Sequence, residues 1–153
     1  MKRRPIIIDC DPGHDDAMAI LWALASEELE IKAITTVAGN QTIEKVTNNA
    51  IRVLTKAKKY DIPVAKGAEA PLVRKLVVGG DLVHGDSGLE GPVLPENGFE
   101  VSELRALELL VKVLEESEEK VTIVGIGPLT NVAQLLITRP DLMEKIEQIS
   151  IMG

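Results

Sequence analysis

Short apolar runs alternate with amphipathic segments along most of the chain. The first run, "PIIIDC" at residues 5–10, is rich in β-branched residues and begins at Pro5, a pattern that predicts a buried strand. From Asp15 onward the apolar residues recur instead at helical spacing, with acids in the first turn. The same alternation predicts strands at residues 30–37, 62–67, 120–127 and 146–152, and helices at residues 42–59, 102–117 and 128–138.

Three residues mark the starts of the later helices. Thr42 and Ser102 are expected to cap the helices that follow them, and Pro128 is expected in the first turn of the last helix. Buried strands that alternate with helices form a parallel sheet whose two faces are covered. The sequence therefore predicts an α/β fold with an open, mainly parallel sheet and helices on both faces, in one domain over residues 1–153.

Residues 68–100 break this alternation. They include "VGGDLVHGDSGLEGPVLPENG", which is rich in Gly, Pro and Asp and shows little periodicity. Irregular segments of this length inside compact domains usually have a function or are mobile. We therefore expect residues 68–100 to form a long loop at an active site.

Composition narrows the classes of function. The net charge of −7 and the absence of Lys/Arg blocks argue against a nucleic-acid partner, and 2% aromatic residues leave no platform for stacking bases. Aspartate interrupts the N-terminal apolar run, and no apolar stretch is long enough to span a membrane. A cytoplasmic protein without a membrane partner is predicted. The chain closes on an apolar strand with no helix behind it, which predicts self-association, so we expect a homo-oligomer.

Candidate chemistry gathers directly behind the first strand. "DCDPGHDD" places four carboxylates within eight residues, those of Asp9, Asp11, Asp15 and Asp16. Ligands of parallel sheets bind at the carboxyl ends of the strands, so this segment should meet "AGNQ" and "GIGPLTN", which follow two other strands. Clustered carboxylates repel unless one is protonated or a cation lies among them, and oxygen ligands favour Ca²⁺ or Mg²⁺ over Zn²⁺. For Asp15 or Asp16 alone, an ordinary acid at a helix start is the simpler explanation.

Three other features leave alternatives open. The glycines of "GIGPLTN" are compatible with a phosphate site, and equally with a turn whose Thr and Asn cap the next helix. His84, in "LVHGDSG", is more often a surface or structural histidine unless other site residues surround it. His14 is compatible with an ordinary turn residue.

These residues also resemble a known family. "DCDPGHDDAMAI" resembles the N-terminal signature of the inosine-uridine preferring nucleoside hydrolases, and the resemblance continues in order through "ITTVAGNQT", "PLVRK", "HGDSGLEGP", "GPLTNVA" and "ISIMG". The "HDD" form and "HGDSGLEGP" look most like the pyrimidine-preferring bacterial ribonucleoside hydrolases. The resemblance implies a Rossmann-like core that hydrolyses the N-glycosidic bond of ribonucleosides of the uridine, cytidine or inosine type with Ca²⁺.

The resemblance also implies a metal site. Asp11 would be a Ca²⁺ ligand and the general base for the attacking water. Asp16 would bind Ca²⁺ with both carboxylate oxygens. The backbone carbonyl of Ile126 would be a further ligand, at a position where many family members have Thr.

The remaining roles implied by the resemblance concern the substrate. Asp15 would hold a ribose hydroxyl, and Asn40 would lie close to the ribose and the metal. His84 would face the base and help it leave, as a catalytic and binding residue. Asp9 has no direct contact in this scheme, and a supporting hydrogen-bond role is expected.

Family members are about twice as long as this chain. The resemblance therefore predicts that residues 1–153 are the N-terminal part of a nucleoside hydrolase, weakly active or inactive alone. One alternative is a non-catalytic Ca²⁺- and ribose-binding domain. Another is a haloacid-dehalogenase-like phosphatase, which also begins with an apolar strand and two aspartates. That family needs Thr or Val shortly after the second aspartate, where this chain has Pro12 and Gly13.

Overall fold

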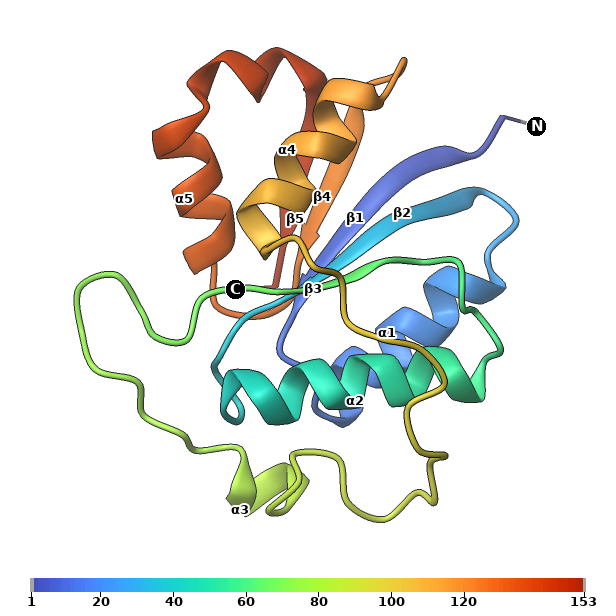
Figure 1. Cartoon of the computed structure of the whole chain (residues 1–153), viewed down its shortest axis with the longest axis vertical. Coiled ribbons are helices and arrows are strands. Elements are labelled where there is room, and N and C mark those ends of the chain that lie inside the picture. Colours follow the sequence, from blue (N-terminus) through green and yellow to red (C-terminus); the bar gives the residue numbers. More distant parts are fainter. Residues whose placement is uncertain (1, 153) are drawn as a thin grey trace.

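A parallel sheet forms the centre of the molecule, as the alternating pattern predicts (Figure 1). The structure is a computed structural model and describes residues 2–152. In sheet order β3-β2-β1-β4-β5, the strands are β3 (Val64–Lys66), β2 (Leu29–Thr36), β1 (Arg4–Cys10), β4 (Val121–Gly125) and β5 (Ile146–Ile151).

Helices cover both faces of this sheet, which confirms the predicted α/β class (Figure 1). α1 (His14–Ala25) and α2 (Ile43–Lys56) lie on one face, and α4 (Ala106–Glu116) and α5 (Thr130–Thr138) lie on the other. Side chains of β1 alternate between the two resulting cores. Ile6 and Ile8 pack in the core of α1 and α2, whereas Ile7 packs in the core of α4 and α5. The strand is therefore apolar on both sides, as its sequence predicts.

Two predicted helix starts are wrong. α4 begins at Ala106 rather than near Ser102, because the Ser102 hydroxyl accepts the N–H of Leu104 in a local turn. Arg105 occupies the N-cap position of α4 instead, and its backbone N–H donates to Glu108 Oε2 at 2.7 Å. α5 begins at Thr130, so Pro128 precedes the helix instead of lying in its first turn. Thr42 does occupy the N-cap of α2, but without a side-chain hydrogen bond.

The long loop predicted at residues 68–100 runs from β3 around α2 to the segment that precedes α4 (Figure 1). It contains one short helix that the sequence pattern did not predict, α3 (Asp81–His84). A second unpredicted element, the 3₁₀ helix η1 (Pro140–Lys145), connects α5 to β5. Across residues 2–152, every helix is too short or too polar to cross a lipid bilayer.

The strand order identifies the place where a ligand would bind. Moving outward from β1, the chain first goes to β2 and β3 on one side and then returns to β4 and β5 on the other. In open sheets of this order, the crevice for a ligand lies at the carboxyl ends of the two strands where the direction reverses. Here those strands are β1 and β4, so the segments after Cys10 and Gly125 should flank the site.

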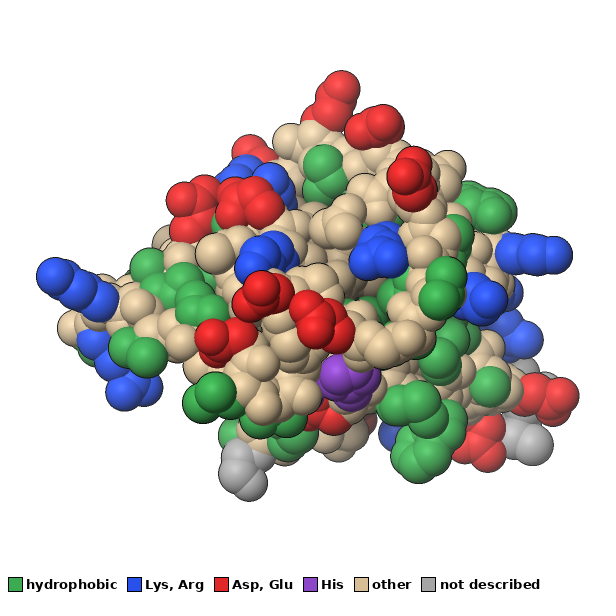
Figure 2. Space-filling view, turned by 90° about the horizontal axis from the view of Figure 1, so that it is seen from below, with side chains coloured by type: hydrophobic (Ala, Val, Ile, Leu, Met, Phe, Trp, Pro, Cys, Tyr) green, Lys and Arg blue, Asp and Glu red, His purple; other side chains and the backbone are tan. Residues whose placement is uncertain are grey.

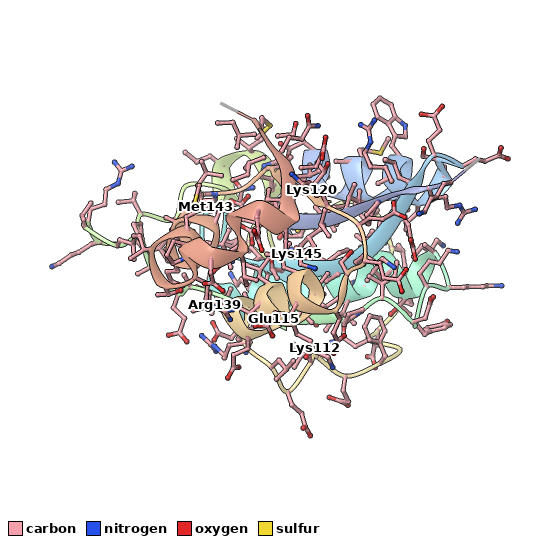
Figure 3. All side chains as sticks on the ribbon, turned by 90° about the horizontal axis from the view of Figure 1, so that it is seen from above. Lys112, Glu115, Lys120, Arg139, Met143 and Lys145 are labelled. Atoms are coloured by element: carbon pink, nitrogen blue, oxygen red, sulfur yellow. The ribbon has the colours of Figure 1, made fainter. Side chains whose placement is uncertain are left out.

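A surface ion-pair group joins α4 to η1. Arg139 donates to Glu115 at 2.8 Å and to Asp141 at 2.6 Å, and Figure 3 shows Arg139 and Glu115 on the same side of the molecule. Exposed ion pairs of this kind contribute little to stability. The attachment of α4 must therefore depend on its buried side, which carries Leu109, Leu110 and Leu114.

Replacing Leu114 with alanine is expected to lower the free energy of unfolding by about 2–5 kcal/mol, because it leaves a cavity under a fully buried side chain. Lys112→Ala, on the exposed side of the same helix, is the matched control and should change it by less than about 0.5 kcal/mol. Urea unfolding followed by circular dichroism measures both. Similar values for the two variants would contradict this assignment of the buried side.

Candidate active site

Asp11 directly follows β1, at the edge where the strand order reverses. Asn40, from the segment after β2, donates its backbone N–H to Asp11 Oδ2 at 2.7 Å and its side-chain Nδ2 to the Asp11 carbonyl at 3.0 Å. Two glycines lie against the carboxylate: a Cβ atom at Gly39 would stand 2.3 Å from Oδ2, and one at Gly127 would stand 2.8 Å from Oδ1. The predicted meeting of the three segments is confirmed.

Asp16 lies in the first turn of α1 and is 2% exposed. Its Oδ2 accepts the N–H of Gly13 at 3.3 Å. Its Oδ1 is buried and has no hydrogen-bond partner among the described residues. A buried oxygen without a partner is costly, so this atom is available to a ligand.

Burial dominates the electrostatics of both carboxyl groups. Burial, together with the smaller effect of the neighbouring Asp15 charge, raises the pKa of Asp11 to about 6, against the lowering effect of the hydrogen bond from the Asn40 N–H. Burial likewise raises the pKa of Asp16 to about 7, with the charge of Asp11 as the next cause. Two buried like charges are unfavourable unless protonated or neutralised, and a cation held by both would neutralise them. Carboxylate oxygens suit a hard ion such as Ca²⁺ or Mg²⁺.

The four aspartates do not form a single metal-binding cluster. Between residues 2 and 152, no three His, Cys, Asp or Glu side chains are grouped so that they could hold one ion. Asp11 and Asp16 therefore need backbone, water or substrate oxygens to complete a shell. Ile126 lies nearby in the chain after β4, and its N–H donates to the Asp9 carbonyl at 2.9 Å. Its carbonyl remains a predicted ligand.

Asp9 is engaged elsewhere through one oxygen, and its Oδ2, like Asp16 Oδ1, is buried without a hydrogen-bond partner among the described residues. Asp9 Oδ1 accepts the Thr35 hydroxyl at 2.5 Å and Asn131 Nδ2 at 2.8 Å. The amide of Asn131 also donates to the Thr36 carbonyl at 2.9 Å and accepts the N–H of Ala68 at 2.9 Å. Asp9 and Asn131 thus join the ends of β1 and β2 to the start of α5. Asn131 does not cap α5; it is 1% exposed and belongs to this buried network.

The loop brings His84 to the aspartate segment, and its role in a site stays a prediction. The His84 ring lies so close to Gly13 that a Cβ there would stand 2.6 Å from Nε2. His84 Nε2 is 3.8 Å from Asp15 Oδ1, and its Nδ1 is 2.9 Å from His14 Nδ1. His14 is thus a helix residue whose ring also contacts the Glu90 carbonyl at 2.7 Å. In Figure 2 a histidine surface lies beside acidic side chains and an apolar area.

Residues 6–153 match the family model described as inosine-uridine preferring nucleoside hydrolase. The chain belongs to this family. Its relatives include the pyrimidine-specific ribonucleoside hydrolase RihA of Photobacterium profundum, 57% identical over 150 residues, which are 98% of this chain and 48% of the relative. The RihA protein of Salmonella typhimurium is 59% identical over 149 residues, 97% of this chain and 48% of the relative. The chain spans about half the length of the curated relatives it matches.

Solved structures agree with a nucleoside hydrolase fold. A plant nucleoside hydrolase superposes with a TM-score of 0.90 at 38% identity, covering 99% of this chain and 48% of that one. The purine-preferring ribonucleoside hydrolase of Gardnerella vaginalis superposes with a TM-score of 0.92 at 27% identity, covering 98% of this chain and 48% of that one. The family membership sets aside the haloacid-dehalogenase-like alternative.

The sequence pattern did not predict the polar residues that hold this candidate site together. Thr35 and Asn131 support Asp9, and Asn49 of α2 bonds to the loop. A usable signal existed for Asn49, because it lies on the face of α2 where helical spacing otherwise places apolar residues such as Val46 and Val53. Thr35 offers no comparable signal, because threonine is an ordinary strand residue.

Proposed function

We propose that the protein takes part in the hydrolysis of the N-glycosidic bond of ribonucleosides, releasing ribose and the free base. The observation that carries this proposal is the buried pair of Asp11 and Asp16 at the strand-order reversal, with Asp16 Oδ1 lacking a partner. Family membership supplies the reaction class. Relatives 57% and 59% identical are named pyrimidine-specific, so uridine and cytidine are the first substrates to test.

Ca²⁺ is the proposed cofactor. Asp11, both oxygens of Asp16 and the Ile126 carbonyl would hold it. The unpartnered oxygen of Asp16 and the mutual repulsion of the two carboxylates support this assignment. When bound, such an ion supplies positive charge that orients hydroxyl groups and makes water easier to ionise.

The chain's own residues would divide the remaining work. Asp11, whose carboxylate is oriented by the hydrogen bond from the Asn40 N–H, would take the proton of the attacking water. Asp15 is 57% exposed at its side chain and would accept a hydrogen bond from a ribose hydroxyl. Cleavage of a ribosyl bond develops positive charge on the sugar, which these carboxylates stabilise. His84 would donate a hydrogen bond from Nε2 to the departing base.

A direct assay of the 153-residue chain with uridine and with inosine, each with Ca²⁺, tests this function. Release of free base supports the proposal. Binding of Ca²⁺ and ribose in calorimetry without release of base would favour the second candidate, a non-catalytic Ca²⁺- and ribose-binding domain. The lack of three grouped metal-ligating side chains within residues 2–152 favours that candidate. A chain that binds neither would overturn both.

Ca²⁺ is expected to raise the thermal midpoint more at about pH 8 than at about pH 5. The folded-state pKa values of Asp11 (about 6) and Asp16 (about 7) lie above the ordinary value of 3.8. Protonation therefore favours the folded state, and this stability is lost as the pH rises through both values. A cation replaces the protons at high pH and competes with them at low pH.

Circular dichroism melts at both pH values, with and without Ca²⁺, measure this difference. The Asp16→Asn variant should show a smaller Ca²⁺-dependent shift at the higher pH, because it loses one ionised ligand. Equal shifts at the two pH values, or the same shift in the variant, would contradict a site made by these carboxylates.

A homo-oligomer and a cytoplasmic location stay predictions. β5 lies at the edge of the sheet, and most of its side chains are exposed. An exposed edge strand is a ready template for pairing with another chain, which supports the proposed self-association. Light scattering of the purified chain measures its oligomeric state.

A further inference from the structure

Asn49 joins two segments that are far apart in the sequence. It is a residue of α2, 1% exposed, and its Nδ2 donates to the Pro12 carbonyl at 3.1 Å and to the Ser87 carbonyl at 2.9 Å. Pro12 belongs to the turn between Asp11 and Asp16, and Ser87 belongs to the loop that carries His84. A single amide nitrogen therefore uses both of its hydrogens to hold the loop against the aspartate turn.

The packing around this amide is close. The loop backbone passes directly over it, because a Cβ atom at Gly88 would stand 3.2 Å from Asn49 Nδ2. Gly88 has a φ of 79°, a conformation that glycine adopts readily and other residues rarely do. The loop thus approaches the helix through its backbone, and its Ser87 carbonyl points at the buried amide.

The same loop segment is attached at two further carbonyls. Lys45 donates to the Asp86 carbonyl, and the His14 ring contacts the Glu90 carbonyl at 2.7 Å. Both of these contacts are exposed, and each involves a flexible or surface side chain. The Asn49 bonds differ because one is buried and the other is partly buried, and because they reach the aspartate turn as well as the loop. Loss of Asn49 would therefore change the spacing between these two segments while the outer contacts still keep the loop attached.

We propose that Asn49 is a positioning residue for the proposed nucleoside hydrolysis, setting where the His84 ring lies relative to the aspartate turn. The expected change in turnover rests on the proposed function. The position of the His84 ring is a property of the fold and does not depend on that function. The ring of His84 rests on Gly13, the residue after Pro12, so Asn49 bonds one carbonyl from each of the two segments that meet at that contact. Small errors in such positioning reduce rates strongly.

The test uses Asn49→Asp, with Asn48→Asp as its matched control. Asn48 is the adjacent residue of the same type and is exposed. Asn49→Asp keeps the shape of the side chain but replaces the donor with an oxygen that repels both carbonyls. The turnover number for uridine is expected to fall at least about tenfold, with Ca²⁺ affinity unchanged, and Asn48→Asp should match the parent chain.

A second measurement does not need turnover. The chain has two histidines, so the imidazole signals in a ¹H–¹⁵N or ¹H–¹³C spectrum are readily assigned. The His84 signals should shift in Asn49→Asp and stay unchanged in Asn48→Asp. If the parent chain shows no turnover, as expected of an N-terminal part that is inactive alone, the His84 signals still decide the role of Asn49.

A third measurement uses the unmodified chain, so it does not depend on whether a variant folds. The side-chain Nδ2 protons of Asn49 should exchange with solvent far more slowly than those of Asn48, because Asn49 is buried and doubly bonded. Equal exchange for the two amides would overturn the proposal. So would a folded Asn49→Asp variant with unchanged His84 signals.

Discussion

Asp11→Asn is expected to slow uridine hydrolysis by about 10²–10⁴-fold, the usual contribution of a general base, and to weaken Ca²⁺ binding at least about tenfold. Asparagine has nearly the shape of aspartate, and its side-chain oxygen can still accept the Asn40 N–H that now lies 2.7 Å from Oδ2. The variant therefore keeps the geometry and removes the charge and the proton acceptor. Rates of base release and calorimetric Ca²⁺ titrations measure the two effects separately.

Asp61→Asn serves as the control, because Asp61 is exposed in the turn after α2. It removes the same charge from the chain and should leave both the rate and the Ca²⁺ affinity unchanged. Retention of Ca²⁺ binding and of hydrolysis in Asp11→Asn would contradict both proposed roles of Asp11. Retention of binding with loss of hydrolysis would support a role as base alone.

Gly39→Ala is expected to lower hydrolysis by about 10²-fold although it touches no substrate. The added Cβ would stand 2.3 Å from Asp11 Oδ2 and 2.7 Å from Pro128 Cγ, far inside normal contact distance. The carboxylate cannot move aside without weakening its bond from the Asn40 N–H. Gly39→Ala thus displaces the charge that Asp11→Asn removes, and Ca²⁺ affinity should fall in both variants.

Gly79→Ala is the matched control for this substitution. Gly79 also lies in an irregular segment, but a Cβ there would meet no atom within 4 Å. Both variants should fold, as circular dichroism can show, and Gly79→Ala should keep the parent rate and Ca²⁺ affinity. A Gly39→Ala protein with parental Ca²⁺ binding would mean that the carboxylate position tolerates displacement, against the proposed site.

The local pattern of apolar and polar residues predicts the strands of the sheet, but it misplaces the starts of two helices. Apolar, β-branched runs such as Ile6–Ile8 are buried on both faces, because a central parallel strand is covered on both sides. Ser102 and Pro128 carry ordinary helix-start signals, yet α4 and α5 begin later. Both residues serve loops instead, because a hydroxyl or a proline fits a turn as well as a helix start.

The sequence by itself determined the alternation of strands and helices, and the crowding of four aspartates where the first strand ends. Only the tertiary structure divided the roles of those aspartates. Asp9 is bonded through Oδ1 to Thr35 and Asn131, whereas Asp11 is bonded to Asn40 and Asp16 to Gly13. The physical reason is that periodicity specifies which face of an element is buried. The partner of a buried polar atom comes from a segment distant in sequence, and only the folded chain brings it within hydrogen-bond distance.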